Sequence, residues 1–79
     1  MNLYICTAEK HNYDSTVAVL IAAKSTTGLK SFIRQQAENV SFGDNNAVWL
    51  GGRYSSKYVG SAASDIKDEK ILLTEYLAG

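Results

Sequence analysis

The sequence has very little cysteine and histidine, and this shortage excludes two ways of stabilising a small domain. Among the 79 residues, Cys6 is the only cysteine and His11 is the only histidine. One thiol cannot form an intrachain disulfide, and one cysteine with one histidine cannot supply the four ligands of a structural zinc site. A chain this short buries a limited core, so we expect a modest stability that dimerisation or tight partner binding would raise.

The sequence also lacks an excess of charge of either sign. Eight Lys and Arg residues balance eight Asp and Glu residues, which gives a formal net charge of zero. A dedicated nucleic-acid-binding protein normally carries a large basic excess, and an acidic mimic of DNA would carry the opposite excess. The composition therefore disfavours both classes, and we do not expect nucleic acid as the partner.

Long hydrophobic runs are absent as well. The longest apolar run, residues 17–23, is far too short to cross a bilayer. The first residues, MNLYICTAEKHNY, contain neither the basic segment nor the long apolar core of a signal peptide. A lone unpaired thiol suits a reducing compartment. We therefore expect a soluble, cytoplasmic protein that makes no contact with a membrane.

The sequence does contain a change of hydrophobic period along a single expected domain, residues 1–79. Residues 2–8 and 16–24 are β-rich and apolar on both faces, which predicts two strands. Over about 26–39, apolar residues recur at helical spacing and predict a helix capped by Ser25 or Thr26. A strand that is apolar on both sides needs cover on both faces. One helix covers only one of them, so we expect the second face to meet a partner.

The second half of the chain predicts further strands. Gly51-Gly52 separates two β-rich runs and is typical of a tight hairpin turn, whose central residues need positive φ. The last residues, 70–79, favour a strand because the run is barely three helical turns long. The predicted fold is α+β: a single mostly antiparallel sheet of four or five strands (β-β-α-β-β-β) with one helix packed on one face. The expected core consists of Leu3, Ile5, Val17, Val19, Ile21, Leu29, Phe32, Ile33, Val48, Leu50, Ile71 and Leu73.

The stretch GGRYSSKY, residues 51–58, interleaves cations with aromatic rings, as sites for single-stranded nucleic acid do. On a strand, however, Arg53 and Lys57 share one face while Tyr54 and Tyr58 share the other. Charges and rings then point in opposite directions, so the stretch is better explained as a hairpin strand or a protein-contact surface, where Tyr and Arg are enriched. The contact residues that we expect, with Trp49 equally compatible with the core, are Tyr13, Trp49, Arg53, Tyr54, Lys57 and Tyr58.

Residues suited to catalysis or metal binding are few. His11 and Asp14 share a loop and could orient a base, but no serine occupies a nucleophile elbow, and Cys6 lies mid-strand, where a small buried residue is typical. The segment GDNN offers one carboxylate, Asp44, where a calcium loop needs several. A solvated turn accounts for the densest acidic group, Asp65, Asp68 and Glu69. We therefore expect no enzymatic activity, no catalytic residue, no cofactor and no metal.

Two segments of the chain resemble known proteins. The stretch LYICTAEKHNYDSTVAVLIAAKS, followed by a helix, is similar to the opening of many short phage and bacterial proteins. The stretch KYVGSA, with the terminal ILLTEYLAG, is similar to their ending. The resemblance implies a small structural arrangement and lends no catalytic residue. In size and element order alone, the chain also resembles small anti-CRISPR proteins, which act by binding a host nuclease complex.

Three hypotheses of function follow. The first is a non-enzymatic small binding protein: a phage or mobile-element inhibitor that binds a bacterial host protein complex in the host cytoplasm, with a homodimer as a further expected association. The second is a nucleic-acid-binding phage accessory protein whose phosphate contacts are Lys30, Arg34, Arg53 and Lys57. The third, a small hydrolase built on His11 and Asp14, has the least support.

Overall fold

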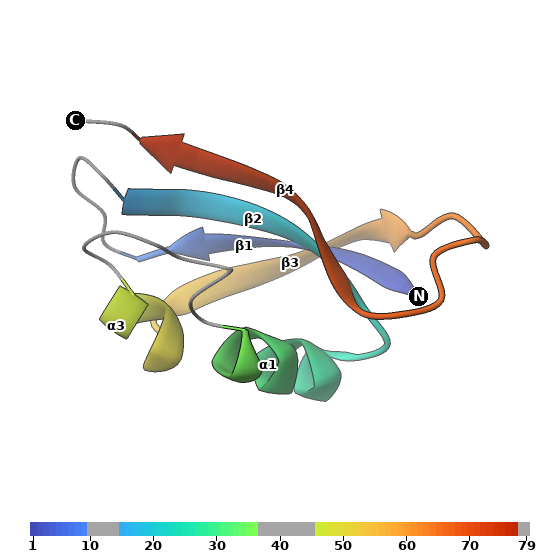
Figure 1. Cartoon of the computed structure of the whole chain (residues 1–79), viewed down its shortest axis with the longest axis horizontal. Coiled ribbons are helices and arrows are strands. Elements are labelled where there is room, and N and C mark those ends of the chain that lie inside the picture. The colour runs from blue at the N-terminus through green and yellow to red at the C-terminus, as the bar shows by residue number, and fades with distance from the viewer. Residues whose placement is uncertain (10–14, 37–45, 78–79) are drawn as a thin grey trace.

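A computed structural model describes residues 1–9, 15–36 and 46–77 of the chain (Figure 1). The elements are β1 (Asn2–Ala8), β2 (Ser15–Ala23), α1 (Thr26–Gln35), α3 (Asn46–Leu50), β3 (Tyr54–Ser61) and β4 (Lys70–Leu77). The four strands form one open sheet in the order β3-β1-β2-β4, and every neighbouring pair is antiparallel. This confirms the expected α+β class and the antiparallel sheet. No helix in the described part of the chain is long and apolar enough to span a membrane.

The connections explain why the helices lie on one side of the sheet. Strands β2 and β3 both pair antiparallel with β1, so they run parallel to each other. Parallel strands require a crossover connection, and here the crossover carries α1 and α3 to the same side of the sheet (Figure 1). Residues 62–69 then join β3 to β4, the two edge strands.

Side chains alternate between the two faces of β1. Tyr4, Cys6 and Ala8 are buried, whereas Ile5 and Thr7 between them are exposed. Because cross-strand partners share a face, the buried set continues across β2, where Ile21 pairs with Tyr4 and Val19 with Cys6. We call the side that carries these buried residues and the helices the covered face, and the side that carries Ile5 and Thr7 the open face.

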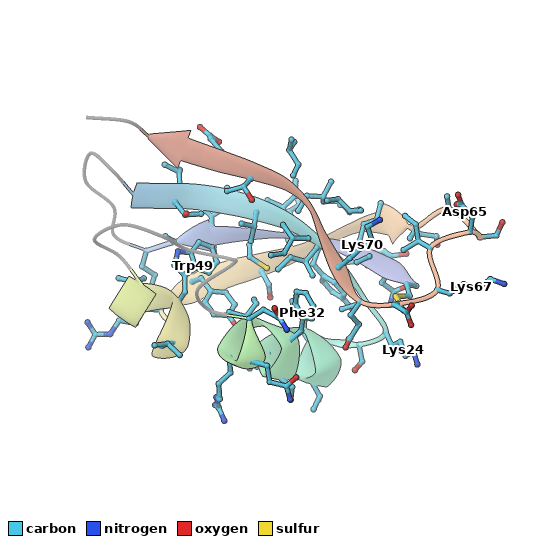
Figure 2. The ribbon with its side chains drawn as sticks, viewed as in Figure 1. Lys24, Phe32, Trp49, Asp65, Lys67 and Lys70 are labelled. Carbon is cyan, nitrogen blue, oxygen red and sulfur yellow. The ribbon has the colours of Figure 1, made fainter. Side chains whose placement is uncertain are left out.

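The core fills the space between the covered face and the two helices. Leu29 and Ile33 from α1 are fully buried, and Trp49 from α3 is only 1% exposed. Figure 2 shows Phe32 and Trp49 between the helices and the strands. The structure confirms the following expected core residues as buried or as packed against the core: Val19, Ile21, Leu29, Phe32, Ile33, Val48 and Ile71.

Five of the expected core residues are not in the core: Leu3 and Val17 are half-buried outside the core cluster, and three others are exposed. Ile5 is 41% exposed, Leu50 is 48% exposed and Leu73 is 68% exposed. Ile5 and Leu73 are apolar residues of the open face, which neither of the described helices covers. Leu50 is the last residue of α3 and faces outward. Apolar character alone therefore did not identify the buried side of these strands.

Helix α1 begins where the sequence predicts. The hydroxyl of Ser25 accepts a hydrogen bond from the backbone N–H of Gly28 at 3.1 Å, so Ser25 is the N-cap. At the other end, the N–H of Gln36 donates to the carbonyl of Phe32 at 2.9 Å. The helix ends at Gln35, whereas the expected helix continued to about residue 39, and residues 37–39 lie outside the described part.

The prediction of a hairpin turn at Gly51-Gly52 is wrong. The residues before it form α3, and the two glycines end that helix. The N–H of Arg53 donates to the carbonyl of Val48 at 2.8 Å, and the N–H of Gly52 donates to the carbonyl of Trp49 at 3.2 Å. With Gly52 at φ 75°, these two bonds form the C-terminal motif in which a left-handed residue closes a helix. A hairpin turn and this helix cap both need a residue with positive φ, so the glycine pair predicted a turn of the wrong kind.

We predict that Gly52→Ala destabilises the domain by about 1 kcal/mol, because an L-residue pays that cost in the left-handed region. No atom lies within 4 Å of the position that a Cβ would take at Gly52, so the cost is conformational and not steric. Gly51→Ala is the matched control, since Gly51 is not among the described glycines with positive φ. Urea denaturation measures both variants, and an equal loss in the two would contradict the assigned cap.

Candidate functional site

The open face carries a row of side chains that crosses all four strands. Lys57 on β3 pairs with Ile5 on β1, Ile5 pairs with Leu20 on β2, and Leu20 pairs with Leu73 on β4. Neighbouring strands lie about 4.8 Å apart, so the row spans roughly 14 Å. Three adjacent apolar side chains thus lie side by side on a surface that no described helix covers.

A second row lies beside the first and is more polar. Thr7 pairs with Ser55 on one side and with Ala18 on the other, and Ala18 pairs with Glu75. The two rows together border a shallow groove of about 190 Å³ lined by Ile5, Ala18, Val19, Leu20, Leu73 and Glu75. The groove is therefore apolar along its floor and acidic at one end.

The charges of the open face lie at its margins. Lys57 is on the edge strand β3 and Glu75 is on the opposite edge strand β4, and both are exposed. The exposed apolar side chains Ile5 and Leu73 lie in the row that starts at Lys57. An apolar centre with charged groups at its rim is the usual composition of a protein-binding surface.

A second feature, a cleft of about 320 Å³, lies on the helical side of the molecule. Its walls come from α1, from α3 with the turn that follows it, and from β3. The lining residues are Lys30, Arg34, Trp49, Leu50, Gly51, Gly52, Tyr54 and Ser56. We call this the basic cleft, because its lining, within the part of the chain that the structure describes, contains two cationic side chains and no carboxylate.

Aromatic stacking builds one wall of the basic cleft. The rings of Trp49 and Tyr54 are stacked with centroids 5.2 Å apart and an interplanar angle of 21°. Burial raises the pKa of Tyr54, the nearby Cys6 raises it further, and the positive charge of Arg34 lowers it. Arg34 and Tyr54 both line the cleft. The two cations, Lys30 and Arg34, are exposed and one helical turn apart on α1.

The structure does not gather the expected contact residues on one surface. Tyr54 stacks on Trp49, and Tyr58, which is 55% exposed, meets the ring of Tyr4 edge-on at 6.0 Å. Both tyrosines therefore lie on the covered side of β3, while Lys57 lies on the open face. This confirms that the rings and Lys57 point to opposite sides of the strand. Tyr13 lies outside the described residues.

The two remaining residues of the expected contact surface are Trp49 and Arg53. Trp49 is almost fully buried, so its place is in the core, one of the two positions that the sequence allowed. Arg53 is exposed directly before β3, and its carbonyl accepts a hydrogen bond from the N–H of Glu9 at 3.0 Å. The four cations proposed as phosphate contacts are likewise divided, since Lys30 and Arg34 line the basic cleft and Lys57 lies on the open face.

Sequence reasoning missed the two surfaces for different reasons. Ile5 and Leu73 were assigned to the core, although the two-sided apolar character of β1 and β2 did indicate an uncovered face. The basic cleft depends on α3, which was predicted to be a strand. The spacing of Lys30 and Arg34, four residues apart on a predicted helix, was the available signal for two cations on one helical side.

The residues considered for catalysis or metal binding are only partly described. His11, Asp14 and Asp44 lie outside the described residues. The acidic residues 65, 68 and 69 fall in the connection between β3 and β4, where Figure 2 shows Asp65 and Lys67. Within residues 1–9, 15–36 and 46–77, no group of three His, Cys, Asp or Glu side chains is placed to hold a metal ion.

Cys6 is enclosed at the centre of the sheet. Its side chain is fully buried on the covered face, and this burial raises the pKa of the thiol from 9.0 to about 12. Since the thiolate is the nucleophile, the folded protein holds Cys6 in its unreactive form at neutral pH.

We predict that Cys6 resists a thiol-labelling reagent in the folded protein at pH 8 and reacts stoichiometrically in concentrated guanidinium. The contribution of Cys6 to the free energy of unfolding is constant below pH 9 and falls as the pH rises from 9 toward 12, because the unfolded thiol ionises first. The extent of labelling is measured by the absorbance of the thiolate that the reagent releases when it reacts with Cys6. Rapid labelling of the native protein would show that Cys6 is accessible.

The chain was also compared with known proteins. No protein-family model, no curated protein and no solved structure matches it. Two features of the chain's own residues bear on its function: an apolar open face with charged margins, and a basic cleft with an aromatic wall.

Proposed function

We propose that this chain is a non-enzymatic binding protein of a phage or mobile element that inhibits a bacterial host protein complex by docking through the open face. The observation that carries the proposal is the row of Ile5, Leu20 and Leu73, which places two exposed apolar side chains on either side of the half-buried Leu20 on a face that no described helix covers. Exposed apolar clusters of this kind mark interaction surfaces in soluble proteins. The phage origin is supported by the resemblance of the chain's two ends to short phage and bacterial proteins.

The size of the open face favours a larger partner over a second copy of the chain. Four strands at about 4.8 Å spacing and about six residues at 3.3 Å rise give a sheet area of roughly 400 Å². A stable interface buries about 800 Å² on each partner, so a dimer confined to this face would be weak. A larger protein can also contact the β3 edge, where Arg53 is exposed.

The charges specify the chemistry of the partner surface. A complementary surface presents an apolar strip, with an acidic group opposite Lys57 and a basic group opposite Glu75. Lys57 lies on one edge strand and Glu75 on the other, and Lys70, which pairs with Ala22, adds a cation to the β4 edge, so all three charges bear on the orientation of the partner across the sheet. Such pairs contribute more to specificity and association rate than to affinity.

The support for a non-enzymatic role comes from the sequence and from Cys6. The only thiol of the chain is buried and protonated at neutral pH, so it is unsuited to act as a nucleophile. The acidic residues of the connection between β3 and β4 are spread over a solvent-facing segment, with Asp65 and Asp68 exposed. Binding through a surface needs neither group.

We predict that Leu73→Asp abolishes capture of a host protein, because it places a charge in the centre of the apolar row. The more conservative Leu73→Thr keeps a β-favouring side chain and removes apolar area. Burying a leucine is worth about 1.5–3 kcal/mol, and Leu73 is 68% exposed before docking, so we expect a loss of about tenfold in affinity. Tagged variants are used to capture proteins from a nuclease-treated bacterial lysate.

The matched control is Ser31→Asp, which adds the same charge at an exposed position of α1, an element on the helical side of the sheet. Support requires a stoichiometric protein band with the wild type and with this control, lost with Leu73→Asp at an unchanged melting temperature. Equal capture by both aspartate variants, or no band with the wild type, contradicts the proposal. If sedimentation shows that the wild type is a dimer and that Leu73→Asp is a monomer, the open face binds a second copy of the chain and not a host protein.

A further inference from the structure

The basic cleft lies on the side of the sheet opposite the apolar row, and its residues are not used by the open face. From its geometry we propose that the basic cleft binds a nucleoside phosphate, with the phosphate on Lys30 and Arg34 and the base against the Tyr54 side of the cleft. The ligand is either a free nucleotide or the terminal nucleotide of a single strand, which present the same chemistry. This inference does not depend on docking through the open face.

The charge of the cleft matches a phosphate monoester better than a carboxylate. Lys30 and Arg34 lie one turn apart on α1, and the described residues of the cleft lining include no acidic side chain to neutralise them. A phosphate monoester carries about −1.5 to −2 charges at neutral pH, which two cations balance. One carboxylate would leave a cation unpaired. Arginine also supplies the planar pair of donors that phosphate oxygens accept.

The remaining walls suit a planar apolar group. Leu50 is 48% exposed at the cleft, and Tyr54 is fixed there by its stacking on the buried Trp49. Stacking of a base on an aromatic side chain is worth about 1–3 kcal/mol and tolerates any base. A ring already held by a core residue loses little freedom when a ligand arrives.

Two further features of the lining leave room for the ligand and orient it. Gly51 and Gly52 form the turn at one wall and have no side chains to fill the cleft. The hydroxyl of Ser56, two residues after Tyr54 on the same strand, can donate to or accept from a sugar or a phosphate. The volume of about 320 Å³ is within the range of small-molecule sites, roughly 300–1,000 Å³.

The test uses Trp49 as an internal reporter, because it is the only tryptophan of the chain and stacks on the cleft wall. Its fluorescence is recorded during titration with adenosine 5′-monophosphate, with adenosine, and with a 5′-phosphorylated oligodeoxyadenosine. We expect saturable changes with both phosphorylated probes and at least tenfold weaker binding of adenosine. Arg34→Gln and Lys30→Gln should each weaken binding of the phosphorylated probes about tenfold.

The matched control is Lys67→Gln, which removes an exposed cation of the β3–β4 connection, shown in Figure 2, that is not among the cleft-lining residues. Its affinity should equal that of the wild type. The ligand is the end of a nucleic-acid strand if the oligonucleotide binds more tightly than the mononucleotide. Its affinity should then fall roughly sevenfold between 50 and 200 mM salt, as expected for two phosphate contacts. Equal binding identifies the free nucleotide. No saturable response, equal affinity for adenosine, or unchanged affinity in Arg34→Gln overturns the proposal.

Discussion

Burial of the covered face is the interaction on which the rest of the structure depends. Val19 and Ile21 of the sheet meet Leu29 and Ile33 of α1 and Trp49 of α3 in one cluster. Each such side chain contributes about 1.5–3 kcal/mol when fully buried, and no disulfide is available to add to this in a chain with one cysteine. The helices must therefore remain on this face, which places the basic cleft between them and β3 and leaves the opposite face open.

Strand β3 contributes to both surfaces through the alternation of its side chains. Tyr54 and Ser56 line the basic cleft, whereas Ser55 and Lys57 belong to the open face. A shift of one residue in the register of this strand would exchange the two sets. The two surfaces also respond differently to solution conditions, because salt screens the cations of the cleft and has little effect on apolar contact.

Much of the fold was predictable from local patterns. Strand β1, strand β2, the Ser25 cap of α1 and strand β4 all follow from hydrophobic period and capping chemistry, which act over a few residues. The apolar triplet before Gly51 fits a strand or a short helix equally well. Only its packing against α1 and β3 selects the helix, and that is tertiary information.

The candidate sites were less predictable than the fold. The two-sided apolar strands indicated an uncovered face, but the assignment of Ile5 and Leu73 to the core required knowing which face the helices take. Trp49 is compatible from the sequence with either the core or a contact surface, and a buried indole normally finds an acceptor. Here its N–H is buried with no hydrogen-bond partner among the described residues, a cost of about 1–3 kcal/mol that stacking and burial of the ring offset.

The strand order has a consequence for the growing chain during synthesis. The two central strands, β1 and β2, emerge first, and both edge strands lie in the second half of the sequence. The hairpin of β1 and β2 therefore exposes two unpaired backbone edges until the C-terminal half has been made. Contacts so distant in sequence form slowly, and open edges can pair with other chains. Translation thus passes through an aggregation-prone stage that ends only when the last strand completes the sheet.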